Sequence, residues 1–148
     1  MDAPPPSDMG RLANADARMR HAFLRDMVLQ ASIGIYAHEK AARQRVRVNV
    51  DLGVTEDERE LADKLDRVVD YEKVATSVRQ IVETGHVHLV ETLAERIAAT
   101  CLRDERVRVA RIRVEKLDVF ADTESAGVEI ERRALPAARK SSTPFTDL

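Results

Sequence analysis

Four side chains that could bind a polar ligand or move a proton lie at the ends of predicted helices and strands. Glu39 follows a strand, and Tyr71 opens a helix. Glu91 opens a second helix, and Lys116 ends a later strand. Element ends on a rigid scaffold are where sites tend to be built. A phenol, an amine and two carboxylates could supply acid–base groups and acceptors for N–H donors. The alternatives are a loop Glu, a Tyr with a packed ring, a Glu that only caps its helix and a solvated Lys.

Glu91 lies in a helix with one apolar stripe. Residues 86–101 carry apolar side chains at helical spacing: Leu89, Val90, Leu93, Ala94, Ile97 and Cys101. Glu91 points away from the centre of that stripe and falls in the first turn, where the helix dipole favours a negative charge. A carboxylate held there can bind a polar ligand, and the alternative is an acid that only stabilises the helix.

The composition indicates one globular domain without a membrane or nucleic-acid partner. The chain has 148 residues, of which 44% are hydrophobic, 34% charged and 3% aromatic, with no Trp and a net charge of −2. The charge gives no attraction to nucleic acid or anionic membranes, and few aromatics are present on which bases could stack. No apolar span or secretory signal is evident, and Cys101 is the single cysteine, so we expect a cytoplasmic protein.

Residues 1–20 and 135–148 are predicted to be disordered tails, because they are rich in Pro and in small or polar residues without a sustained period. The folded domain is then predicted over residues 21–134. No internal repeat is evident.

The pattern within this domain predicts an α+β fold. Strands are expected over residues 23–35, 45–54, 107–114 and 127–132, with a bulge near Ala110. Helices are expected over 71–83, with Asp70 as N-cap and Gly85 as C-cap, and from Glu91 to about residue 103. The segment 55–69 is charged and irregular, with one short helical turn. The predicted layout is a four-stranded antiparallel sheet with two helices covering one face.

Several segments together resemble the dihydroneopterin aldolases of folate biosynthesis. They are GIYAHE (34–39), QRVRVNVDL (44–52), VDYEKVA (69–75), LVETLAERIA (89–98) and VEKLDVFADTESAGVEIER (114–132). The resemblance covers about residues 22–133, with the segments in the family's order. One departure is Leu117, which follows Lys116 where many of these aldolases have proline.

The resemblance implies the tunnelling fold (T-fold). In that fold an antiparallel sheet is backed by two helices, and the sheets of neighbouring subunits close into a barrel. It implies a homo-octamer of two stacked tetramers, or a homotetramer, with active sites between subunits. A closed barrel would also remove the exposed edge strands of a lone four-stranded sheet.

The same resemblance implies a role for each candidate residue. Glu91 matches the glutamate that anchors the pterin, with the backbone around Leu89 and Val90 completing the pocket. Lys116 matches the general acid/base, and Glu39 the loop glutamate that helps place this lysine and the hydroxyls of the substrate. Tyr71 matches a tyrosine contributed by the adjacent subunit.

The implied reaction is a retro-aldol cleavage of 7,8-dihydroneopterin into glycolaldehyde and 6-hydroxymethyl-7,8-dihydropterin. The C1′–C2′ bond breaks once the 2′-hydroxyl is deprotonated, and the N5=C6 imine accepts the electrons. Neither a Schiff-base lysine nor a metal cofactor is implied, because the substrate supplies its own electron sink.

Three alternatives remain open. The related dihydroneopterin triphosphate 2′-epimerase uses a similar Glu, Tyr and Lys set, and Arg43, Arg45 and Arg47 could form a triphosphate-binding patch. A non-catalytic pterin-binding protein would explain the fold without requiring Lys116.

A zinc site is the third alternative. His86 and His88 are spaced as HxH, but metal binding requires three or four converging ligands, and neither a cysteine nor a third histidine lies near them in the sequence.

Overall fold

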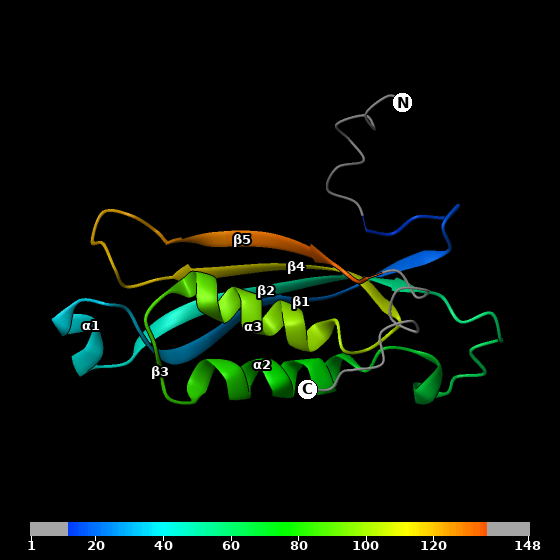
Figure 1. Ribbon diagram of the computed structural model, residues 1–148, viewed down its shortest axis with the longest axis horizontal. Helices are drawn as coiled ribbons and strands as arrows, with labels where there is room; N and C mark the ends of the chain where they lie inside the picture. Colours follow the sequence, from blue (N-terminus) through cyan, green and yellow to red (C-terminus); the bar gives the residue numbers. More distant parts are fainter. Residues whose placement is uncertain (1–11, 136–148) are drawn as a thin grey trace, which may run out of the picture.

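The chain forms one twisted sheet with two helices packed on one face. The computed structural model describes residues 12–135. The elements are β1 (Met19–Ile33), α1 (Ala37–Ala41), β2 (Gln44–Thr55), the 3₁₀ helix η2 (Leu65–Arg67), α2 (Tyr71–Glu83), β3 (His86–Val87), α3 (Val90–Cys101), β4 (Val107–Lys116) and β5 (Ala126–Arg133). The sheet order is β3-β1-β2-β4-β5, and α2 and α3 lie side by side over it (Figure 1).

The predicted α+β layout is confirmed, with one strand more than expected. β1, β2, β4 and β5 pair antiparallel, as the pattern predicts. The four-stranded prediction is wrong because the two-residue strand β3 pairs in parallel with the end of β1. Two residues carry no periodicity, so β3 was hidden in the turn between the two predicted helices. The short helix α1 was missed for the same reason.

Alternation of side chains sorts β2 into two faces. Val46, Val48 and Val50 are fully buried against the helices, and Arg45 and Arg47 lie on the opposite face. From the helix side, the buried residues Leu93 and Ile97 of α3 and Val78 of α2 complete this aliphatic core. This close-packed core makes the sheet rigid. The loops at the ends of the sheet carry the polar groups.

Helix α2 matches its predicted bounds, and Asp70 caps it by accepting a hydrogen bond from the backbone N–H of Glu72 at 2.9 Å. Gly85 follows with a φ of +70°. Helix α3 begins at Val90 and ends at Cys101, two residues before the expected end. The predicted helical turn in the 55–69 segment is η2.

Two irregularities bend the strands. The register between β2 and β4 shifts at Arg108, two residues before the bulge expected near Ala110. A second shift, not predicted, places Arg25 and Asp26 of β1 opposite Asn49 alone. Asp26 has a φ of +58°, and Asn49 holds it with two side-chain hydrogen bonds of 2.9 and 3.0 Å.

Defined structure begins before residue 21, the first residue of the predicted domain. β1 begins at Met19 and is preceded by a turn in which Asn14 bridges to Met19, so residues 12–20 are not a structureless tail. Leu12 is buried, which ties this turn to the fold. The remainder of the predicted tails, residues 1–11 and 136–148, lies outside the described residues. The domain boundaries stay a prediction.

Candidate active site

Lys116 and Glu39 meet at one end of the sheet, although they are 77 residues apart in the chain. The Nζ of Lys116 donates to Oε2 of Glu39 at 2.6 Å. Glu39 is only 6% exposed, and Lys116 is half-buried at the last position of β4. Lys116 pairs with Val46 in the sheet, so its side chain lies on the face that the helices cover.

Glu39 remains a carboxylate despite its burial. Burial raises the pKa of Glu39, but hydrogen bonds from Lys116 and Gln44 and the positive charge of Lys116 outweigh it, and the pKa falls below its usual value. A buried charge is tolerated only with such partners. The pair therefore presents an ammonium and a carboxylate side by side, which can pass protons to and from a bound hydroxyl.

Gly34 makes room for Glu39. A Cβ at this position would lie 2.2 Å from Cδ and 2.5 Å from Cβ of Glu39, and the φ of Gly34 is +126°. No side chain fits there, and an L-residue would be strained in this conformation. Glu39 therefore occupies the space that a side chain at position 34 would fill.

His86 of the HxH pair has a structural role at the same place. The Nε2 of His86 lies 2.9 Å from the carbonyl oxygen of Gly34 and must donate to it, because a carbonyl only accepts. Its Nδ1 lies 2.5 Å from the hydroxyl of Ser32. Both ring nitrogens of His86 are thus occupied, and residues 12–135 contain no cluster of three or more His, Cys, Asp or Glu that could hold a metal ion.

Glu91 lies at this end of the sheet and is free to bind a ligand. It sits in the first turn of α3, directly after β3, which pairs with Ser32 and Ile33 at the end of β1. Glu91 is exposed and has no hydrogen-bond or ion-pair partner among the described residues. Leu89 is half-exposed beside it, and Val90 is buried. An unpaired carboxylate next to an apolar surface suits a flat ligand with N–H donors on one edge.

Tyr71 is not brought together with the other candidate residues. Helix α2, which Tyr71 opens, begins at the opposite end of the sheet (Figure 1). There Tyr71 lines a hollow together with Phe23 and Val54. Lys116 pairs with Val46, and Val54 lies eight positions further along β2, a span of roughly 26 Å at the usual rise per residue. Tyr71 is 66% exposed. One chain therefore cannot combine Tyr71 and Lys116 in a single site.

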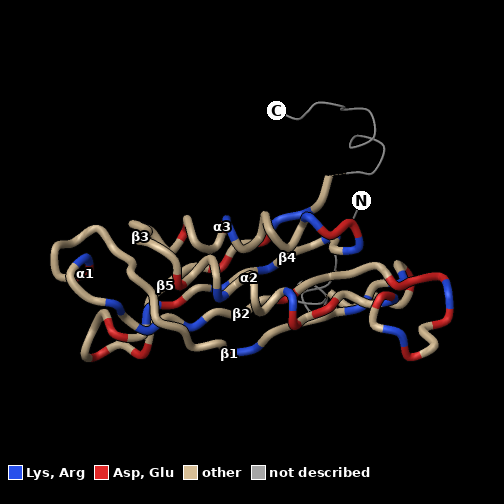
Figure 2. Tube along the Cα trace, turned by 90° about the horizontal axis from the view of Figure 1, so that it is seen from below, with Lys and Arg blue, Asp and Glu red and all other residues tan. Residues whose placement is uncertain are grey.

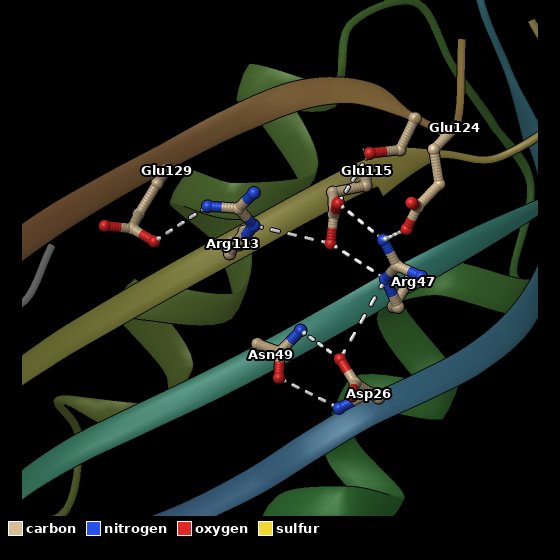
Figure 3. Close-up of polar contacts among 8 residues, drawn as sticks. Asp26, Arg47, Asn49, Arg113, Glu115, Glu124 and Glu129 are labelled. Carbon is tan, nitrogen blue, oxygen red and sulfur yellow. Dashed lines mark hydrogen bonds and ion pairs between the residues drawn. The ribbon is translucent and has the colours of Figure 1, made fainter.

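The face of the sheet behind Lys116 carries a network of ion pairs (Figure 3). Arg47 donates two hydrogen bonds to Glu115, at 2.8 and 3.0 Å, and Ser125 donates a third at 2.7 Å. Arg47 also lies 3.5 Å from Glu124. Because Glu115 precedes Lys116 and Ser125 precedes β5, this network fixes both ends of the connecting loop.

The backbone after Lys116 is held without a proline. The N–H of Leu117 donates to the carbonyl of Arg45 at 3.1 Å, a bond that proline could not make. Asp118 accepts from the backbone N–H of Arg45 at 2.9 Å and from its guanidinium at 2.7 Å. The Lys-Leu sequence thus extends the β2–β4 ladder by one residue.

The arginines considered as a triphosphate-binding patch all have partners within the chain. Arg43 donates to the carbonyl oxygens of Gln30 and Glu83, Arg45 pairs with Asp118, and Arg47 pairs with Glu115. Basic and acidic residues are interspersed along the strands (Figure 2). The structure therefore does not present these arginines as a free basic patch.

A large hollow lies elsewhere in the structure. It has a volume of about 680 Å³ and lies between η2, α2 and α3, near Cys101 and away from Lys116. Burial raises the pKa of the Cys101 thiol to about 11, so this cysteine is a packing residue and not a nucleophile. None of the helices in the described part of the chain has the length and apolar character needed to span a membrane.

Comparison with known proteins gives one consistent family. The family model "Dihydroneopterin aldolase" matches residues 22–131. A dihydroneopterin aldolase of Streptomyces coelicolor is 36% identical over 100 residues, covering 68% of this chain and 84% of that protein. A dihydroneopterin aldolase of Bacillus subtilis is 29% identical over 118 residues, covering 78% of this chain and 98% of that protein.

Solved structures agree with this family and with the T-fold. The Burkholderia thailandensis dihydroneopterin aldolase bound to guanine is 40% identical, with a TM-score of 0.69 over 79% of this chain and 93% of that one. The Escherichia coli dihydroneopterin aldolase in complex with neopterin is 25% identical, with a TM-score of 0.71 over 76% of this chain and 98% of that one.

We predict that Gly34→Ala breaks the contact between Lys116 and Glu39. The new Cβ would overlap Glu39, so the carboxylate must move. Gly85→Ala is the matched control, because Gly85 also has a positive φ but no atom would lie within 4 Å of its Cβ. We expect Gly85→Ala to lower the free energy of unfolding by about 1 kcal/mol. The loss for Gly34→Ala should be larger than that for Gly85→Ala by about 1 to 3 kcal/mol. Urea denaturation at fixed protein concentration measures both, and equal losses would contradict the steric role of Gly34.

A second prediction concerns acid stability and Glu115. Hydrogen bonds from Arg47, working against burial, hold the pKa of Glu115 at about 2, below its usual 4.5. A lowered folded-state pKa stabilises the protein above pH 4.5, and this stabilisation is lost as the pH falls towards 2. Glu115→Gln should therefore remove about 3 kcal/mol of stability at neutral pH and flatten the pH dependence between 4.5 and 2. Glu129→Gln, at an exposed partner of Arg113, is the control. Parallel pH profiles for wild type and Glu115→Gln would refute the assignment.

Proposed function

Because the chain belongs to the dihydroneopterin aldolase family, we propose that it cleaves 7,8-dihydroneopterin into 6-hydroxymethyl-7,8-dihydropterin and glycolaldehyde. The observation that carries this proposal is the buried Lys116–Glu39 pair at the same end of the sheet as the unpaired Glu91. One end of the sheet thus offers a carboxylate for the pterin ring and a proton-transfer pair for the side chain of the pterin.

Glu91 is proposed to bind the pterin ring. A carboxylate accepts two parallel N–H donors, and the 2-amino group and N3–H of a pterin present such a pair. Guanine carries the same arrangement on its N1–H and 2-amino group, which is consistent with guanine in the Burkholderia thailandensis structure. Leu89 and Val90 would lie against the ring.

Lys116 and Glu39 are proposed to act on the side chain of the substrate. Removal of the proton from the 2′-hydroxyl allows the C1′–C2′ bond to break, which releases glycolaldehyde. The bonding electrons pass into the N5=C6 imine, and protonation of C1′ then gives the hydroxymethyl product. Lys116 relays these protons, and Glu39 holds both the ammonium group and the substrate hydroxyls.

Tyr71 is proposed to come from a neighbouring subunit and to shape the protonation step. Its place at the far end of the sheet supports this division, because it cannot reach Lys116 of its own chain. The outer edges of β5 and of most of β1 have no partner strand among residues 12–135. Unpaired edges can join to those of further copies, as expected for a homotetramer or homo-octamer whose sheets close into a barrel.

A free dihydroneopterin, rather than its triphosphate, is the proposed substrate. Arg43, Arg45 and Arg47 are occupied by partners in the chain, so they do not supply a phosphate-binding patch. We further propose that the enzyme works in the cytoplasm, as expected for folate biosynthesis, which cell fractionation would test.

The purified protein should release glycolaldehyde from 7,8-dihydroneopterin, with hydroxymethyl-dihydropterin as the second product on chromatography. A separate incubation with dihydroneopterin triphosphate should leave that compound unchanged. Formation of a 2′-stereoisomer of the triphosphate without cleavage would assign the epimerase instead. No change in either compound, together with guanine binding, would leave a non-catalytic pterin-binding protein.

Complementation between two inactive variants should reveal a site shared by neighbouring subunits. Lys116→Ala and Tyr71→Ala chains, unfolded together and refolded as mixed rings, should recover activity at about a quarter of the sites. The matched control is Lys116→Ala refolded with Glu39→Ala. One subunit supplies both residues to a site, so no site in these mixed rings is intact. Recovery in the control, or none in the first pair despite demonstrated subunit mixing, would contradict the division.

A further inference from the structure

Gln44 is a residue of the site that the sequence-based reasoning did not single out. It is the first residue of β2 and is partly buried. Gln44 and Val46 are two positions apart on one strand, so their side chains lie on the same face of the sheet, which is also the face of Lys116. Gln44 thus stands on the helix-covered face, next to the Lys116–Glu39 pair.

The amide group of Gln44 joins two separate elements. Its Nε2 donates to the carbonyl oxygen of Ile33, the last residue of β1, at 2.9 Å. The same Nε2 lies 3.3 Å from Oε2 of Glu39 in α1 and donates to it. An amide nitrogen has two hydrogens, so both bonds can be made at once. The bond to Ile33 holds the amide in a fixed orientation towards Glu39.

Both donors act on the same oxygen of Glu39. Lys116 donates to Oε2 at 2.6 Å, and Gln44 approaches that oxygen from β2. The other oxygen, Oε1, occupies space that is open because position 34 is glycine, since a Cβ there would lie 2.3 Å from it. Gln44 therefore holds the oxygen of Glu39 that Lys116 also contacts.

Among residues 12–135, Lys116 is the one charged side chain that forms a hydrogen bond or ion pair with Glu39. Lys116 of β4 is its ion-pair partner among the described residues, and His86 of β3 reaches only the carbonyl of Gly34. Glu91 of α3 lies at the same end without a contact to Glu39. Removing the amide of Gln44 therefore changes the surroundings of Glu39 without removing a charge.

We propose that Gln44 is a positioning residue, which fixes the ionised Glu39 against Lys116 for proton transfer to and from the substrate. This inference rests on the proposed aldolase function. It assigns Gln44 no contact with the pterin ring, whose binding is proposed to depend on Glu91 at the other side of the site.

The test compares Gln44→Met with wild type. Methionine has a similar length but cannot donate, so the pKa of Glu39 should rise. We expect kcat to fall about ten-fold, and the acid limb of the kcat/KM profile to move up by about 0.5 to 1 pH unit. The affinity for guanine should not change. Gln80→Met, an exposed position on α2, is the matched control and should behave as wild type.

The outcomes separate this inference from the proposed function. If wild type cleaves dihydroneopterin but Gln44→Met keeps the wild-type profile, or loses activity equally at every pH, the positioning role is wrong. If wild type shows no cleavage, the proposed function fails, and an NMR titration of ¹³C-labelled Glu39 still tests the role of Gln44. In that titration, the midpoint for Glu39 must rise in Gln44→Met. If this variant does not fold, Gln44→Leu, which also cannot donate a hydrogen bond, takes its place in both measurements.

Discussion

A carboxylate that is 6% exposed stays ionised only if a cation and hydrogen-bond donors replace the water it has lost. Glu39 obtains them from Lys116 and Gln44, and it obtains its space from the missing side chain of Gly34. Each of these groups comes from a different element, so the sheet and its helices must form before the pair can exist. The loop containing Gly34 is fastened in turn by His86 of β3. The buried pair therefore depends on the whole end of the sheet.

The placement of Tyr71 follows from the geometry of α2. A helix of 13 residues spans about 20 Å, so α2 separates its first residue from the β3 end of the sheet. Glu91 opens the next helix after a short turn and thus returns to the Lys116 end. An antiparallel helix pair must place its two N-termini at opposite ends. A site that uses both helix starts is therefore built most simply from two chains.

The parts of this fold that could be predicted from the sequence are strands and helices long enough to show a hydrophobic period on their own. Alternating valines in 46–50 and the capped apolar face of 71–83 are such cases. The two-residue β3, the short α1 and the bulge at Asp26 have no period, and they depend on contacts with distant residues. The burial of Glu39 and the role of Gln44 were hidden for the same reason. One signal was present in the sequence: Gly34, five residues before a loop glutamate, marks a place where a side chain would not fit.

The charged residues differ in what the fold leaves them free to do. Glu39 and Glu115 are both buried and both supplied with donors, while Arg45 and Arg47 are occupied by Asp118 and Glu115. Glu91 is a carboxylate at a helix start with no such partner among the described residues. A ligand with paired N–H donors therefore gains more at Glu91 than at a carboxylate whose acceptor sites are already filled. In the proposed function, this arrangement would orient the ligand as well as bind it, with the ring at Glu91 and the side chain of the substrate left for Lys116.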